Sequence, residues 1–157
     1  MSRAFVSEEA AEATAALLPE RPISDAPNLV TPKGLKLIEG EVARLQALLA
    51  GTTSDGPERP RIARDLRYWR ARQASARLVE PAAGRTDEVA FGTRVTIDRD
   101  GAAISYQLVG EDEADPSRGL LSWTSPLATA LLGGRVGDVV DIGGGRQAVT
   151  IRRIERN

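Results

Sequence analysis

The chain has 157 residues, enough for one ordinary domain or for a small domain with an appendage. A formal net charge of −1 argues against indiscriminate binding to nucleic acid, and the absence of cysteine and histidine excludes thiolate nucleophiles, disulfides, imidazole bases and the usual zinc ligands. No apolar run approaches the roughly 18 residues of a membrane span, and glutamates interrupt the N-terminus where a secretory signal needs apolar residues, so we expect a cytoplasmic protein with no membrane partner.

Residues 1–28 are expected to form an N-terminal arm. An alanine- and glutamate-rich stretch predicts a short helix, and Pro19, Pro22 and Pro27 forbid its continuation. The arm either stays apart or folds back on the rest of the chain, where it would alter docking.

Residues 29–80 are predicted to form an antiparallel helical hairpin, a short coiled coil. Thr31 is suited to cap the first helix, Pro32 to begin it and Gly51 to end it. Apolar residues follow at steps of three and four, which gives one seam along that helix: Leu35, Ile38, Val42, Leu45 and Leu49. The partner helix lies within 59–80, where Ile62, Leu66 and Trp69 repeat the spacing, and the turn falls at 51–58.

Residues 81–88 are expected to be a linker, and residues 89–157 a small antiparallel sheet domain. Five short segments rich in β-branched or aromatic residues are separated by turn signals, with hairpin turns expected at 98–101 and 143–145. One short helix is predicted in SPLATALLGG, where Ser125 can cap and Pro126 can begin it. The fold class is therefore α+β, a helical hairpin followed by a sheet with one helix.

Four short motifs follow one another in the second half of the chain: FGTRV (91–95), LVGEDEAD (108–115), SPLATALLG (125–133) and VGD (136–138). In this order they resemble the C-terminal domain of the Gre family of bacterial transcript-cleavage elongation factors. LVTPKGLKLIEGEVARL, from residue 29, is similar to the same family more loosely. The resemblance implies an isomerase-like sheet domain that docks on the rim of RNA polymerase, and a coiled coil that enters its secondary channel.

The same resemblance directs attention to the hairpin tip, where the family carries an aspartate and, three residues later, a glutamate that help to hold a metal ion. Asp55 and Glu58 keep that spacing, whereas Arg59 and Pro60 replace the family's asparagine and its small neighbour. Aligned with the family, each helix is about ten residues shorter, which at ~1.5 Å per residue removes roughly 15 Å of reach. The simpler interpretation of the two acids is therefore a solvated turn at a helix N-terminus.

Two mechanisms compete within this resemblance. Either the tip reaches the active centre of the polymerase, shares its magnesium and stimulates RNA cleavage, or the short hairpin occupies the channel and modulates access. The length argument favours the second, with no catalytic residue, no metal site and no cofactor in this chain.

The docking surface implied by the resemblance comprises an acidic loop and the start of the predicted helix: Asp112, Glu113, Asp115, Ser125, Pro126 and Leu127. Four acids within five positions would ordinarily sit in a solvated loop, and their spacing does not follow that of a calcium loop. We therefore expect a contact with a partner protein. Ser125 has no histidine to act as its base, so a helix cap is expected in place of a nucleophile.

Arginines crowd the second helix, and we expect Arg61, Arg64, Arg67 and Arg70 to contact nascent RNA or the channel walls. The alternative is that these arginines only give the helix a charged surface in contact with solvent and bind no partner. Trp69 falls on the apolar seam and is expected to pack, whereas Tyr68 lies off it and is a candidate for a contact.

Two rival functions come from other classes. Prolyl isomerisation would need an aromatic pocket, for which this domain offers only Phe91, Tyr106 and Trp123. A general RNA-binding module would bind RNA without polymerase, in a salt-sensitive manner.

Overall fold

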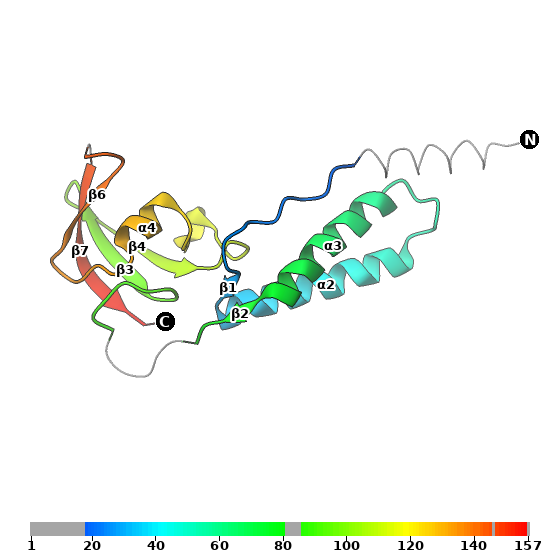
Figure 1. The fold of residues 1–157 in the computed structure, drawn as a ribbon, viewed down its shortest axis with the longest axis horizontal. Helices are drawn as coiled ribbons and strands as arrows, with labels where there is room; N and C mark the ends of the chain where they lie inside the picture. The colour runs from blue at the N-terminus through cyan, green and yellow to red at the C-terminus, as the bar shows by residue number, and fades with distance from the viewer. Residues whose placement is uncertain (1–17, 81–85, 146, 157) are drawn as a thin grey trace, which may run out of the picture. The chain divides into compact units, whose positions relative to one another are not determined.

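The computed structural model describes residues 18–80, 86–145 and 147–156, and Figure 1 shows its course. The chain divides into two compact units, one made of residues 1–27 and 36–75 and the other of residues 28–35 and 76–157. The helix predicted near the N-terminus and most of the predicted linker lie outside the described residues. Within the described part, no helix is both long and apolar enough to cross a membrane.

The first unit is built on two helices, α2 (Pro32–Gly51) and α3 (Arg59–Ser75), which run antiparallel (Figure 1). Their contact is the predicted seam, with Val42, Leu45 and Leu66 buried and with Leu49, Ile62 and Trp69 packed against them. Each fully buried side chain of this kind stabilises the folded state by about 1.5–3 kcal/mol. Both helices lie within the range predicted for the hairpin.

The first turn of α2 follows from its sequence. The Thr31 side chain accepts a hydrogen bond from the Gly34 amide at 3.0 Å, and Pro32 begins the helix, as predicted. Helix α3 ends at Ser75, earlier than the predicted limit of residue 80. Beyond it, β2 (Arg77–Leu78) pairs in parallel with β1 (Leu29–Val30), a two-residue pairing that the sequence did not predict.

The second unit contains a five-stranded sheet in the order β5-β4-β3-β7-β6. Its strands are β3 (Arg94–Arg99), β4 (Ala102–Val109), β5 (Leu120–Ser122), β6 (Val139–Ile142) and β7 (Gln147–Glu155). All five coincide with predicted segments. The sheet is not wholly antiparallel as predicted, because β5 joins β4 in parallel after a crossover through a short 3-10 helix, η1 (Pro116–Arg118).

Both predicted hairpin turns are present. Asp100 and Gly101 take positive φ values of 53° and 82° between β3 and β4, and the glycines 143–145 do the same between β6 and β7. Helix α4 (Pro126–Leu131) contributes Ala128 and Leu131 to the apolar core of the sheet. The rest of that core is Val89, Val95, Ile97, Leu108, Leu121, Val149 and Ile151. The mixed α+β class is therefore confirmed.

Candidate functional site

The parallel pairing of β4 and β5 brings the two predicted docking segments to one edge of the sheet. Gln107 pairs with Leu120 and Val109 with Ser122, so both strands end side by side. The acidic loop follows the end of β4, and the turn leading to Ser125 follows the end of β5. Because parallel strands place their carboxyl ends at the same edge, residues 110–115 and 123–127 form one face, here called the docking face.

The acidic loop is closed on itself by backbone hydrogen bonds. The Asp115 amide donates to the Leu120 carbonyl at 2.9 Å, and the Leu120 amide returns a bond of 3.0 Å. The Asp115 carboxylate caps η1, accepting from the Ser117 amide at 3.2 Å and from its hydroxyl at 2.6 Å. Asp115 therefore has a structural role in addition to the contact predicted for it.

Glu113 also has a partner within its own unit. Its carboxylate accepts a hydrogen bond from the Thr31 hydroxyl. A Cβ placed on Gly34 would meet this carboxylate at 2.7 Å, and one placed on Gly110 would collide with the Leu29 carbonyl oxygen. The acidic loop therefore contacts the segment that begins α2. No pattern in the sequence indicated this contact.

Around α4, the predicted docking residues differ in exposure. Ser125 caps the helix, accepting from the Ala128 amide at 3.3 Å, as predicted. Pro126 is exposed, whereas Leu127 is half-buried and packs against the sheet core. Pro126 is therefore an exposed apolar side chain of the docking face.

At the hairpin tip, both candidate acids are exposed. Asp55 and Glu58 flank a tight turn in which Gly56 is buried, with a Cβ there meeting the Thr52 methyl at 2.8 Å. Among the residues that the structure describes, no cluster of three acidic side chains is arranged to hold a metal ion. The tip could thus offer a cation two carboxylates at most, with the other ligands coming from elsewhere.

Arg59, which stands where the family has asparagine, closes the tip. Its guanidinium Nη1 donates to the Leu49 and Thr52 carbonyl oxygens, both at 3.2 Å. These carbonyls lie at the end of α2, where few backbone donors remain; the Leu49 oxygen also accepts a bond from the Thr52 amide at 3.3 Å. Arg59 therefore ties the start of α3 to the end of α2, a role that sequence reasoning missed because the side chain reaches ten residues back.

The four arginines predicted for RNA or channel contact divide into two pairs. Arg61 and Arg70 are exposed and take part in no ion pair within the described part of the chain. Arg64 binds the neighbouring Asp65 at 3.1 Å, and Arg67 binds Glu20 from the N-terminal arm. The structure thus leaves two of the four predicted contacts open and gives the other two partners within the chain.

Residues 18–27, the described part of the arm in the first unit, fold back along α3 (Figure 1). The Arg21 guanidinium lies 3.9 Å from the centre of the Tyr68 ring and 5.7 Å from that of Trp69, and it approaches Asp65 to 3.7 Å. A cation–π contact near the surface contributes about 0.5–1 kcal/mol. The hydrogen bond from Arg67 lowers the pKa of Glu20, and the same bond raises the pKa of Arg67.

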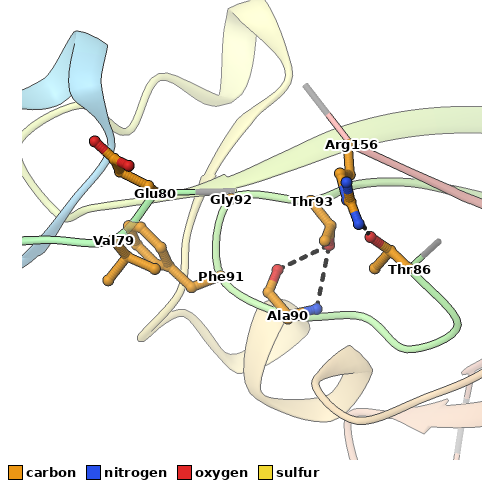
Figure 2. Close-up of a pocket in the computed structure, with 8 residues that line it drawn as sticks. All are labelled: Val79, Glu80, Thr86, Ala90, Phe91, Gly92, Thr93 and Arg156. Carbon is orange, nitrogen blue, oxygen red and sulfur yellow. Dashed lines mark hydrogen bonds between the residues drawn. The ribbon is translucent and has the colours of Figure 1, made fainter. Parts of the chain in front are cut away.

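A cavity of about 220 Å³ lies in the second unit beside the FGT turn (Figure 2). Its lining is Val79, Glu80, Thr86, Ala90, Phe91, Gly92, Thr93 and Arg156, and Arg156 donates to the Thr86 hydroxyl at 3.0 Å. Of the three aromatic residues considered for a prolyl pocket, Phe91 lines it and Tyr106 and Trp123 do not.

Residues 84–156 match the protein family described as "Transcription elongation factor, GreA/GreB, C-term". The second half of the chain is thus similar to the C-terminal domain of GreA/GreB elongation factors. Relatives named "Transcription elongation factor GreA" are 40% identical over 68 residues in Sphingopyxis alaskensis and 44% identical over 72 residues in Alkalilimnicola ehrlichii. These matches cover 43% and 44% of this chain and 43% and 46% of the relatives, so the chain spans less than half the length of the curated relatives it matches.

Solved structures similar to this chain carry related names. The GreA factor homolog 1 (Gfh1) protein of Thermus thermophilus is 21% identical, with 83% of this chain and 99% of that chain covered and a TM-score of 0.38. The elongation factor GreA/GreB from Nitrosomonas europaea is also 21% identical, with 81% and 98% covered and a TM-score of 0.41.

Proposed function

We propose that this protein binds bacterial RNA polymerase through its Gre domain and regulates elongation by placing the helical hairpin in the secondary channel, without strong stimulation of RNA cleavage. The observation that carries the proposal is the match of residues 84–156 to the GreA/GreB C-terminal domain, with relatives that are named transcription elongation factors. Such a protein acts in the cytoplasm, where the polymerase is, and any magnesium involved belongs to the polymerase.

The docking face supports the first part of this proposal. It joins an acidic loop to the exposed Pro126 at one edge of the sheet, and the loop is held in shape by the Asp115–Leu120 bonds. A preformed loop loses little conformational entropy when a partner binds. Its carboxylates suit a basic surface on the polymerase, with Asp112, Glu113 and Asp115 as the contributing acids.

Hairpin length supports the second part. Helices of 20 and 17 residues are about 30 and 26 Å long at the rise of an α-helix. Magnesium accepts carboxylate oxygens only at about 2.1 Å, so a tip that stops a few ångströms short contributes no ligand. Occupation of the channel does not require the tip carboxylates to reach a metal ion, because it depends only on the volume and charge of the hairpin.

The alternative within the family is a true cleavage factor acting through Asp55 and Glu58. One experiment separates the two mechanisms: binding to purified core polymerase, with RNA cleavage followed on a backtracked complex in the same samples. Asp55→Asn and Glu58→Gln would be compared with Glu39→Gln, which removes an exposed carboxylate from α2 away from the tip. We expect binding with weak cleavage, equal in all variants; strong cleavage lost only in the tip variants would establish the alternative, and absence of binding would exclude both.

Two other functions remain as alternatives. An isomerase-like fold, which the family resemblance implies for the sheet domain, would favour prolyl isomerisation, but the cavity beside Phe91 supplies one aromatic wall. A peptide isomerisation rate near the uncatalysed one would remove that function. Contact with nascent RNA would involve the exposed Arg61 and Arg70. It would also involve Arg64 and Arg67 if the arm is displaced from α3.

A further inference from the structure

The face of α3 beneath the arm carries arginine and aromatic side chains together. Arg64, Arg67 and Tyr68 stand at helical spacings of three and four, so they share one side of the helix. On this side Glu20 binds Arg67 through three hydrogen bonds, two of them at 3.1 Å, and Arg21 lies over the Tyr68 ring. Both arm contacts are made by adjacent residues.

These two contacts reproduce the chemistry of a nucleotide on a protein surface. A carboxylate paired with a guanidinium occupies the position of a phosphate, and a planar guanidinium over an aromatic ring occupies the position of a stacked base. We propose that the arm is a displaceable cover over a site for single-stranded nucleic acid, formed on α3 by Arg64, Arg67 and Tyr68.

The arm is held in a way that permits displacement. The side chains of Glu20 and Arg67 are 62% and 55% exposed, so salt and water screen their attraction. Ile23, the large apolar residue in the middle of the arm, is 49% exposed and does not anchor it. With prolines at 19, 22 and 27, residues 18–27 form no helix that could hold them on α3.

The positive charge of α3 favours binding of a polyanion in preference to binding of the arm. Helix α3 contains six arginines and one aspartate, whereas residues 18–27 contain one arginine and two acids. A nucleic acid strand brings a phosphate at every nucleotide, and it can extend to Arg61 and Arg70, which are already exposed. A strand therefore gains contacts along α3 that Glu20 alone cannot provide.

The inference does not rest on polymerase binding, so its test uses the full chain alone. Fluorescence anisotropy of a labelled oligouridylate would be measured with the wild type, with Glu20→Gln and with Asp25→Asn. Asp25 is an exposed acid of the same arm that makes no ion pair within the described residues, so its substitution changes the net charge equally. We expect Glu20→Gln to bind about fivefold more tightly than Asp25→Asn at low salt, with the difference shrinking as salt is added.

A separate pair of variants tests whether bases stack on the Tyr68 ring. In the Glu20→Gln background, Tyr68→Phe should keep the tighter binding and Tyr68→Ala should lose it, because only the ring is required. Oligothymidylate of the same length distinguishes RNA from DNA as the ligand. Equal binding by Glu20→Gln and Asp25→Asn, or equal tightening on a duplex whose bases cannot stack on Tyr68, would overturn the inference.

Discussion

The Thr31 hydroxyl donates a hydrogen bond to the carboxylate of Glu113, 82 residues later in the chain. The same oxygen accepts a hydrogen bond from the Gly34 amide and so caps α2. Thr31 is buried, with 6% of its surface exposed. An acid of the docking face is therefore used to fix the first turn of α2, and the docking loop and the helix start depend on one side chain.

Replacing Thr31 by valine should separate this double role from simple packing. Valine keeps the shape but removes both the cap and the donor to Glu113, so we expect the free energy of unfolding to fall by about 1–2 kcal/mol. Thr31→Ser, which keeps the hydroxyl, should lose much less. Urea unfolding followed by circular dichroism measures both, and equal losses in the two variants would show that the hydroxyl contributes nothing.

Two glycines of α2 should respond to alanine in opposite directions. Gly40 has no atom within 4 Å of an added Cβ, so Gly40→Ala should stabilise the protein by about 0.5–1 kcal/mol through helix propensity. At Gly34 the added Cβ would meet the Glu113 carboxylate at 2.7 Å, so the gain should be cancelled or reversed as Glu113 moves away. Thermal unfolding of the two variants provides the comparison, and equal stabilisation would contradict the contact.

Local patterns in the sequence predicted the elements well. Pro32, the seam from Val42 to Leu66 and the turn at Gly101 each act through neighbours along the chain or through a fixed period, and each was found as expected. The pairing of β1 with β2 was not predicted, because strands of two residues are too short to show a periodic pattern in the sequence. Strand β5 was found, but its parallel direction depends on the crossover after β4, which pattern alone does not specify.

For the candidate site, the sequence identified residues and missed their partners. Glu113 was expected to face a partner protein and binds Thr31; Arg67 was expected to face RNA or the channel and binds Glu20. Arg59 was noted only as a departure from the family tip. In each case the partner lies far away in sequence, or across a turn, so spacing along one helix or loop carried no signal for it.

The Arg59 contacts predict a local weakness at the hairpin tip. Arg59→Ala removes the donors to the Leu49 and Thr52 carbonyls, which should fray the last turn of α2 and cost about 1 kcal/mol. Arg61→Ala, which removes an exposed arginine two residues later, should be close to neutral. Amide hydrogen exchange at the end of α2 would rise in the first variant only; similar exchange in both would exclude the tie.

Substitutions of Ser125 distinguish capping from docking. Ser125→Ala should lose about 1 kcal/mol of stability with the cap on α4, whereas Ser125→Asp keeps an oxygen that accepts from the Ala128 amide. If the docking face binds polymerase through carboxylates, Ser125→Asp should also retain binding to the core enzyme. Loss of binding in a stable Ser125→Asp variant would show that the hydroxyl itself contacts the polymerase.

Acidification should release the arm from α3. The hydrogen bond from Arg67 lowers the pKa of Glu20 below its value in a released arm, so the contact is complete above the ordinary value of 4.5 and is lost as the pH falls through the depressed one. Among the described residues, the Asp65 carboxylate also faces the arm, 3.7 Å from the Arg21 guanidinium. The Tyr68 ring resonances, followed by NMR from pH 7 to 3, should shift as Arg21 leaves the ring. In Glu20→Gln the shift should already be present at pH 7 and change little on acidification, whereas an unchanged transition in that variant would show that Glu20 does not hold the arm.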